Sequence, residues 1–297
     1  MTAAPSSLRP GPDAAKHTVV TNALTVDVED YFHVEAFAQV VDRSTWESIA
    51  PRVEANVDRI LDMFARAGVF GTFFTLGWVA ERQPVMVRRI VEAGHELASH
   101  GYGHGRVDRQ DAAGFAADIR RARQILEDVA GVSVFGYRAP TFSITRRMPW
   151  AFRVLEDEGY RYSSSVFPVR HDLYGDPGAP REAFRPGDGA LWEIPMTTLR
   201  LFGRNLPVAG GGYFRLMPYA VYRAALSRFH RTQDRAALFY FHPWEIDPDQ
   251  PRIAAAGPRA RFRHYLNLSA MAGRLERLLQ DFAWDRVDRV FGHLLAP

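Results

Sequence analysis

The chain has 297 residues, of which 47% are hydrophobic and 24% charged, a composition that excludes wholesale disorder. It contains no cysteine, which excludes disulfides, thiolate metal ligands and cysteine nucleophiles, so any metal must bind to His, Asp or Glu. The formal net charge is +3, and the arginines lie beside acids along the whole sequence without forming a basic stripe. We therefore expect no nucleic-acid partner.

The length favours one large domain with extensions over two domains. Residues 1–17 are rich in Pro, Ala and Ser and lack the apolar core of a secretory signal, which predicts a disordered tail over residues 1–20 and a cytoplasmic protein. The longest apolar stretch, residues 69–80, is interrupted by glycines and threonines, so we expect no transmembrane segment. The sequence is silent on the oligomeric state.

Signals for strands and helices alternate along the chain. An apolar run at residues 23–28 predicts a buried strand, and a helix is predicted from Ser44 as its N-cap to Gly68 as its stop. The further expected elements are strands over 69–76, 96–99, 134–138, 190–195 and 237–241, and helices over 84–93, 111–130, 148–158, 218–230 and 268–282. Repeated helix–glycine–strand units predict a mostly parallel α/β sheet, closed or open, with its chemistry at the carboxyl ends of the strands.

Two histidines follow the strand predicted over residues 96–99. His100 and His104 alternate with Gly101 and Gly103 in a segment that favours a turn over a helix. Such a turn can aim two imidazoles at one point, and imidazole is a common zinc ligand. The spacing alone is a weak signal, because two surface histidines in a loop would look the same.

Three carboxylates, those of Asp27, Glu29 and Asp30, come at the end of the first predicted strand. Like charges this close raise one another's pKa, so a bound cation or a proton-transfer role would make the crowding tolerable. A solvated acidic turn is the alternative. Together with the two histidines, the carboxylates make up the ligand set of a catalytic divalent metal, which keeps one position open for water or substrate.

Two further predicted strands end in polar side chains. Arg138 precedes an Ala-Pro pair at the end of the strand over residues 134–138, and His242 precedes Pro243 and Trp244 after the strand over 237–241. Considered alone, Arg138 would be explained by a salt bridge, and His242 would be explained by a buried position in the core.

The order of these four segments resembles the polysaccharide deacetylase family with NodB-homology domains, carbohydrate esterase family 4. The family's first motif is similar to residues 27–30, its second to His100 and His104, its third to residues 138–140 and its last to His242. A closer likeness is to the subgroup found with bacterial exopolysaccharide and exosortase (PEP-CTERM) loci, whose sequences are similar to DVEDYFHVEAF, GGGYFR, FHPWEID and RFRHYLNL in this chain. The resemblance implies an α/β fold, a distorted (β/α) barrel of NodB-homology type over residues 21–250. We expect residues 251–297 to form a C-terminal helical extension packed on the barrel.

The resemblance also implies a role for each matched residue. His100 and His104 would bind one divalent metal, with zinc expected and cobalt or nickel as alternatives. Asp27 would be the general base, Arg138 would orient it and keep it ionised, and His242 would protonate the leaving amine. The backbone N–H of Thr141 would help to hold the oxyanion of the reaction.

The first motif departs from the family pattern, in which two aspartates are adjacent. Here Val28 and Glu29 separate Asp27 from Asp30. If the strand continues past Asp27, Glu29 points to the same side and is the carboxylate ligand; if the chain turns, Asp30 is the nearer one. Both assignments stay open.

The family's fourth motif, an aspartate and a tryptophan that support the acid histidine, is absent, and the matching stretch offers only the serines at positions 163–165. We therefore expect Glu245 or Asp247 to support His242. Among the aromatic residues that flank the motifs, Tyr102, Tyr213 and Trp244 are expected to stack on sugar rings. The glycine run at residues 210–212 either lets the backbone approach something bulky or is a flexible turn.

These observations predict an enzyme that hydrolyses N-acetyl groups on N-acetylhexosamine units of a polysaccharide or its lipid-linked precursor and releases acetate. Two alternatives are an allantoinase-like cyclic amidase and a non-catalytic carbohydrate-binding protein of an export system. The presence of Asp27, His100, His104, Arg138 and His242 together speaks against binding alone, which does not need all five.

Overall fold

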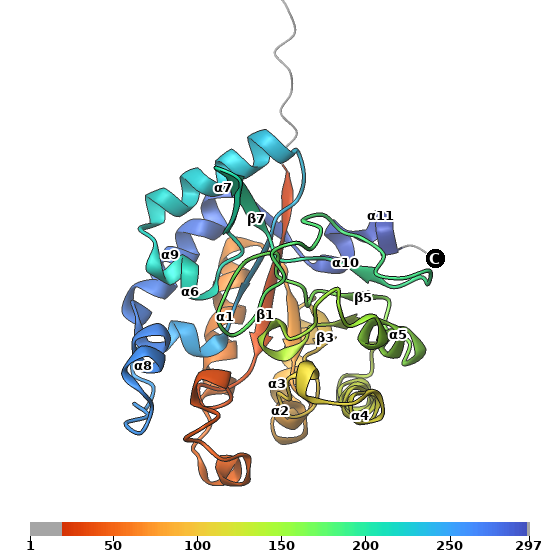
Figure 1. Cartoon of the computed structure of the whole chain (residues 1–297). Helices are drawn as coiled ribbons and strands as arrows, with labels where there is room; N and C mark the ends of the chain where they lie inside the picture. The colour runs from red at the N-terminus through yellow and green to blue at the C-terminus, as the bar shows by residue number, and fades with distance from the viewer. Residues whose placement is uncertain (1–19, 296–297) are drawn as a thin grey trace, which may run out of the picture.

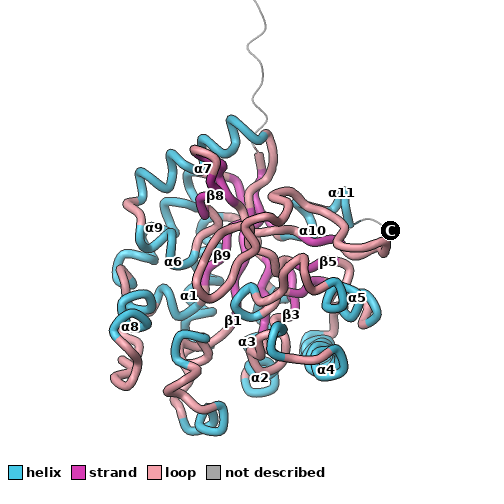
Figure 2. Tube along the Cα trace, in the orientation of Figure 1, coloured by secondary structure: helices cyan, strands magenta, loops and turns pink. Residues whose placement is uncertain are grey.

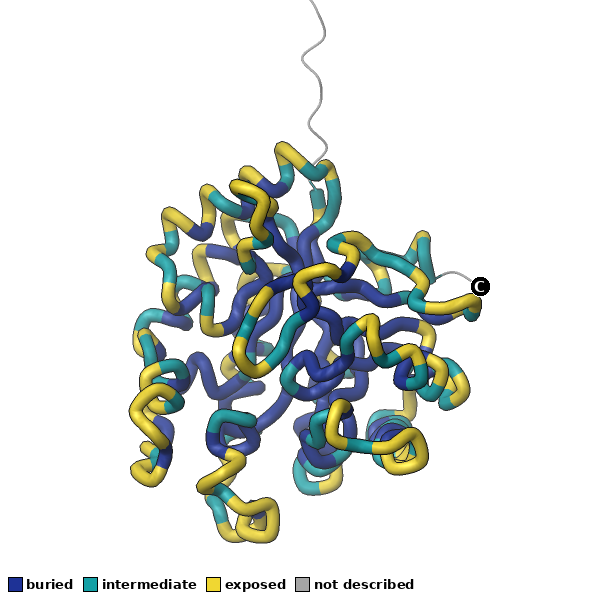
Figure 3. The backbone as a smooth tube through the Cα atoms, in the orientation of Figure 1, coloured by how far each residue is buried: buried dark blue, intermediate teal, exposed yellow. Residues whose placement is uncertain are grey.

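The computed structural model describes residues 20–295 (Figure 1). A parallel sheet lies at the centre, and the helices surround it, so that the strands are the most buried part of the chain (Figures 2 and 3). The tail expected over residues 1–20 lies, except for Val20, outside the described residues. Within residues 20–295 no helix is both long enough and apolar enough to cross a membrane.

The strands of the central sheet follow the order β10-β1-β2-β3-β4-β5-β6, with β9 also paired to β1. Their bounds are β1 Thr21–Val28, β2 Thr72–Thr75, β3 Glu96–Ser99, β4 Gly136–Tyr137, β5 Tyr162–Ser163, β6 Trp192–Glu193, β9 Leu238–Phe241 and β10 Ala283–Asp285. All these pairs are parallel. A separate antiparallel hairpin consists of β7 Thr198–Leu201 and β8 Arg204–Pro207.

Helices connect the strands. Their bounds are α1 Val53–Ala67, α2 Gly77–Arg82, α3 Pro84–Glu92, α4 Ala112–Ala130, α5 Pro149–Asp157, α6 Gly211–Leu216, α7 Tyr219–Gln233, α8 Pro258–Tyr265, α9 Leu268–Asp281, α10 Val287–Val290 and α11 Gly292–Leu295. Short 3₁₀ turns are η1 Glu35–Phe37, η2 Arg43–Ser48, η3 Val107–Arg109, η4 Pro140–Phe142 and η5 Pro243–Ile246. Gly68 and Gly131 end α1 and α4 in the left-handed conformation, as their positions in the sequence indicated.

The sheet closes into a distorted barrel through irregular segments between β6 and β9. Thr197 Oγ1 accepts a hydrogen bond from Leu238 N (2.6 Å), and Ala209 O accepts one from Tyr240 N (2.7 Å). Gly210 makes this approach possible, because a Cβ at that position would lie 2.3 Å from Tyr240 O and φ there is 109°. Of the two readings of the glycine run, close packing of the backbone is therefore the one confirmed.

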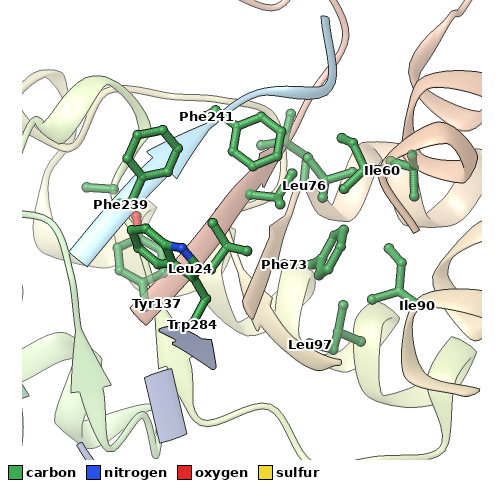
Figure 4. Close-up of a cluster of buried hydrophobic side chains, with 14 of the residues drawn as sticks. Leu24, Ile60, Phe73, Leu76, Ile90, Leu97, Tyr137, Phe239, Phe241 and Trp284 are labelled. Atoms are coloured by element: carbon green, nitrogen blue, oxygen red, sulfur yellow. The ribbon is translucent and has the colours of Figure 1, made fainter. Parts of the chain in front are cut away.

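Side chains from the sheet and from α1, α3 and α9 form the main hydrophobic core (Figure 4). This core includes Leu24, Phe73, Leu97 and Phe239 from neighbouring strands and Ile60 from α1. This packing fixes the register of the strands, and with it the place where each strand ends.

Two sequence predictions differ from the structure. The single helix from Ser44 to Gly68 is wrong: η2 is capped by Asp42, whose carboxylate accepts from Ser44 N, and α1 starts only at Val53. Pro51 separates them, because it lacks an N–H and disfavours the helical conformation in the residue before it.

The second difference concerns the C-terminal segment, expected to be a helical extension. It contains α8 and α9, but β10 joins the central sheet beside the first three residues of β1. Asn22 secures this edge, because its side chain donates to Ala283 O and accepts from Ala237 N, bridging the start of β9 and the start of β10. The segment therefore completes the sheet in addition to packing on it.

Candidate active site

The carboxyl ends of three parallel strands bring the predicted residues together. Asp27 lies near the end of β1 and Glu29 just after it, His100 follows β3, and His242 follows β9. These four side chains line one cavity of about 540 Å³. Because parallel strands end at the same edge of a sheet, segments far apart in the sequence meet there.

Glu29, His100 and His104 form a buried cluster in which the potential ligand atoms all lie within 4.8 Å of one another. His104 Nε2 is 2.8 Å from Glu29 Oε2. His100 Nδ1 lies 2.8 Å from Arg138 O, so this nitrogen carries the proton, since a carbonyl oxygen only accepts. The Nε2 atom of His100 is thereby left available as a candidate ligand atom, in the arrangement typical of metal-binding histidines.

The donor set fits a divalent metal. Glu29 Oε2 is buried and has no hydrogen bond of good geometry among the described residues, although His104 is close. Burial raises the pKa of Glu29, but the neighbouring imidazole of His104 outweighs it and holds the pKa well below its usual range. Burial also lowers the pKa of His100 to about 4, so its ring is neutral at neutral pH. An ionised carboxylate and two imidazoles suit zinc, cobalt or nickel.

Asp30, the other carboxylate left open by the sequence, lies outside this cluster. Its Oδ2 accepts hydrogen bonds from the backbone of Arg52 (2.6 Å) and Val53 (3.0 Å), and its Oδ1 accepts from Tyr31 N (2.9 Å). The chain turns after Glu29, but it turns Asp30 toward the start of α1. Asp30 therefore caps a helix from a distance in the sequence.

Asp27 and Arg138 form a buried ion pair. Arg138 Nη1 donates to Asp27 Oδ1 (2.6 Å) and to Thr25 Oγ1 (2.8 Å), and the arginine is fully buried. Its other side is held by Ser164, whose carbonyl and hydroxyl oxygens accept from Nε and Nη2 at 3.1 Å each. Ser164, one of the serines in the stretch that matches the family's fourth motif, thus supports the arginine and not the histidine. Asp27 Oδ2 is left facing His242 Nε2 at 3.9 Å.

His242 is supported by Glu245, one of the two candidates from the sequence. His242 Nδ1 lies 2.7 Å from Glu245 Oε1, while Glu245 Oε2 accepts from Arg215 Nε (2.6 Å). Asp247 instead binds Arg52 and Asn56. Burial lowers the pKa of His242, but the hydrogen bond to Glu245 and the charge of Glu29 outweigh it and raise that pKa to about 9. The ring is therefore cationic at neutral pH.

The predicted substrate-binding residues divide into two groups. Thr141, Tyr213 and Trp244 line the cavity, and Thr141 has the left-handed backbone conformation (φ 56°). Trp244 also donates from Nε1 to Glu29 Oε1 (3.2 Å). Tyr102 does not line the cavity: its hydroxyl bonds Glu81 and its ring lies under Arg121 on the outer helices α2 and α4.

Sequence reasoning missed several cavity residues. Arg215 stands in the quoted GGGYFR segment, but nothing in that pattern indicates its pairing with Glu245, thirty residues away. Arg259 and Arg263 also line the cavity, beside the aromatic ring of His171. Their spacing of four within a helix was the available signal, but the sequence does not show which way α8 faces.

Comparison with known proteins agrees with this geometry. Residues 41–163 match the family described as polysaccharide deacetylase, and residues 164–292 match one described as a domain of unknown function (DUF3473). Residues 41–163 thus resemble the polysaccharide deacetylase family. The deacetylase segment holds His100, His104 and Arg138, while Arg215 and His242 lie in the second segment.

Two curated relatives carry related names. The chain is 26% identical over 118 residues to a peptidoglycan deacetylase of Helicobacter pylori, which is 38% of either chain. It is 32% identical over 94 residues to a peptidoglycan-N-acetylglucosamine deacetylase of Bacillus cereus, which is 31% of this chain and 34% of that one. The matches thus span little more than a third of these relatives.

A crystal structure from Mycobacterium smegmatis, assigned as a polysaccharide deacetylase, is 21% identical. The structural match covers 97% of this chain and 95% of the Mycobacterium smegmatis chain, with a TM-score of 0.60. This likeness shows that nearly the whole chain shares the fold of that protein, the NodB-type barrel that the sequence predicted.

Proposed function

We propose that the chain is a metal-dependent N-deacetylase that hydrolyses N-acetyl groups on N-acetylhexosamine units of a polysaccharide or its lipid-linked precursor, with the cytoplasm as its compartment. The observation that carries the proposal is the buried cluster of Glu29, His100 and His104 in the same cavity as Asp27 and His242. Metal ligands, a base and an acid are the groups that hydrolysis of a stable amide requires.

Each residue has a role that follows from its contacts. A zinc ion held by Glu29, His100 and His104 would supply Lewis acidity to the amide carbonyl and to the attacking water. Asp27 takes a proton from that water, and Arg138 fixes its orientation through Oδ1 so that Oδ2 faces the reacting atoms. His242, cationic at neutral pH, donates a proton to the leaving amine.

The cavity favours a polymer over the small ring of the cyclic-amidase alternative. Phe262 and Leu216 line it and are 61% and 56% exposed, so it opens widely to the surface. Tyr213 and Trp244 offer ring faces for sugars inside. The sugar-binding alternative does not account for a buried ion pair between Asp27 and Arg138 in the same cavity as the cluster of candidate metal ligands.

The test measures zinc per chain and acetate release from chitotetraose in the same preparations. Wild type should bind about one zinc and release acetate, whereas His100→Ala should lose both. Asp27→Asn should keep the zinc but lose activity by about 10²–10⁴-fold, the usual value of a positioned proton transfer. His293→Ala, which removes an exposed histidine of α11, is the matched control and should behave as wild type.

Two results would contradict the proposal. Zinc binding with hydrolysis of allantoin, but no acetate from chitotetraose, would support the cyclic amidase. Chitotetraose binding without zinc and without hydrolysis would support the sugar-binding protein.

A further inference from the structure

Two arginines of α8 stand at the mouth of the catalytic cavity. Arg259 and Arg263 are four residues apart and so lie on one face of the helix, and both line the cavity. Their side chains are 73% and 36% exposed. Arg263 is also tied to the active site, because its backbone carbonyl accepts from Arg215 Nη2 (3.1 Å), the arginine that binds Glu245. The backbone of α8 at Arg263 is therefore held to the network of Arg215 and Glu245 that supports His242.

The two arginines share a single acid. Asp172 Oδ2 lies 3.0 Å from Arg259 Nη2, and Asp172 Oδ1 lies 3.1 Å from Arg263 Nη2. One carboxylate thus bridges two guanidinium groups, which leaves one positive charge uncompensated. The bridge also shows that the gap between the two guanidinium groups accepts the planar shape of a carboxylate.

The acids that line the cavity do not supply the missing charge. Asp27 is paired with Arg138, and Glu35 with Arg109 at 2.8 Å. Glu29 belongs to the cluster of candidate metal ligands with His100 and His104. Within the described residues, the mouth is therefore more positive than the acids around it can neutralise, and a bound metal would add to this.

Apolar and aromatic surface lies directly beside the arginines. Phe262 and Leu216 are exposed apolar members of the lining, and His171 stacks on Tyr174 with ring centroids 4.0 Å apart. Such surfaces suit the faces of sugar rings, while the arginines suit an acidic substituent on them. We propose that the mouth of the cavity binds the carboxylate of a uronic acid next to the acetamido sugar, so that the substrate is an acidic glycan.

This inference rests on the proposed deacetylase function, and the test separates the two. The substrates are a hyaluronan hexasaccharide, in which N-acetylglucosamine alternates with glucuronate, and the same oligosaccharide with its carboxyl groups reduced to alcohols. Acetate release from chitotetraose measures the function independently. Wild type should prefer the acidic hexasaccharide by about tenfold in kcat/KM, since hydrogen bonds to charged groups are worth more than neutral ones. The preference should shrink in 0.5 M NaCl.

Three variants and one control test whether Arg259 and Arg263 cause the preference for the acidic hexasaccharide. Arg259→Gln and Arg263→Gln should bring the preference close to one by lowering kcat/KM for the acidic hexasaccharide. Asp172→Asn should increase the preference, because it removes the acid that competes with the substrate. Arg261→Gln is the matched control: it removes the same charge from α8, but Arg261 does not line the catalytic cavity.

Equal rates for the two hexasaccharides, including none from either, with acetate still released from chitotetraose would overturn the inference and leave the function intact. Failure of the wild type to release acetate from any of the three substrates, the two hexasaccharides and chitotetraose, would refute the deacetylase function itself. The inference would also be overturned if the variants at Arg259, Arg261 and Arg263 left the substrate preference unchanged and all lost binding to phosphatidylglycerol vesicles equally. That result would assign the positive charge to binding of a membrane surface.

Discussion

Two carboxylates that are adjacent in the sequence, Glu29 and Asp30, have different neighbours. Glu29 faces His100 and His104, and its Oε2 lacks a well-aligned hydrogen bond among the described residues. Asp30 accepts three backbone hydrogen bonds and closes the start of α1. The two acids are thus expected to serve metal binding and helix capping, respectively.

Substitution separates these roles. Glu29→Gln should weaken zinc binding by at least 10–100-fold, because it removes the anionic ligand while keeping the shape of the side chain. Asp30→Asn should keep the zinc but lower the free energy of unfolding by about 1 kcal/mol, since it weakens a helix cap. Zinc titration and thermal unfolding of both variants check this. A larger loss of zinc in Asp30→Asn than in Glu29→Gln would reverse the assignment.

The sequence predicted most of this site because its residues come at the ends of strands, where spacing and order are informative. It left Glu29 and Asp30 open, because the choice depends on a single turn of the backbone after β1. It placed Tyr102 in the site because it lies between His100 and His104, yet φ of 75° at Gly101 lets the chain turn that ring outward. Residues brought in by distant packing, such as Arg215, left no local signal.

At the scale of elements, Arg215 joins three of them. It lies in α6, binds Glu245 of η5 and donates to the carbonyl oxygens of His264 (2.8 Å) and Leu266 (2.7 Å) around the end of α8. Because Glu245 in turn holds His242, the arginine is a positioning residue for the proposed acid. A buried ion pair of this kind is costly to break from one side.

We expect Glu245→Gln and Arg215→Lys to lower kcat for acetate release by about 10–100-fold while zinc content and KM change little. The reason is that the ring of His242 loses its fixed orientation, which affects proton donation and not metal binding. Steady-state kinetics with chitotetraose check this. A rise in KM with unchanged kcat would show that the network serves substrate binding instead.

The sequence predicted helices best where a local signal, such as a glycine or a proline, marks the end or the start of the helix. The glycines after α1, α4 and α5 and the proline at the start of α3 gave helix bounds close to those observed. The hairpin β7–β8 and the short strand β10 were not predicted, since they depend on partners distant in the sequence. β10 in particular has only three residues, and it forms because β1 offers a free edge beside β2.

At the scale of the whole molecule, the C-terminal segment is also tied to the sheet through a buried acid. Glu96 at the start of β3 accepts from Thr72 Oγ1 (2.5 Å), Tyr162 OH (2.8 Å) and Asp288 N (3.2 Å). Burial, and next the charge of Asp288, raise the pKa of Glu96 to about 7. The folded state therefore holds a proton there that the unfolded chain has already lost above pH 4.5.

This has a consequence for stability. As pH rises from about 5 to 8, the folded protein should lose about 2–3 kcal/mol of unfolding free energy through Glu96, because the raised pKa favours the protonated form in the folded state. Glu96→Gln should remove this part of the pH dependence. Thermal or urea unfolding of both proteins at pH 5.5 and 8 measures it, and parallel pH profiles would contradict it.

β1 carries Asp27 and leads to Glu29, and its neighbours are β2, β9 and β10. Two of these three neighbours are made last when the chain is synthesised from its N-terminus. At ordinary rates of translation, roughly 10–50 s separate the appearance of β1 from that of β10. During this interval the strand that bears the proposed base has an unpaired apolar edge, which is a template for aggregation. The growing chain is therefore expected to need protection by a chaperone until its final strands emerge.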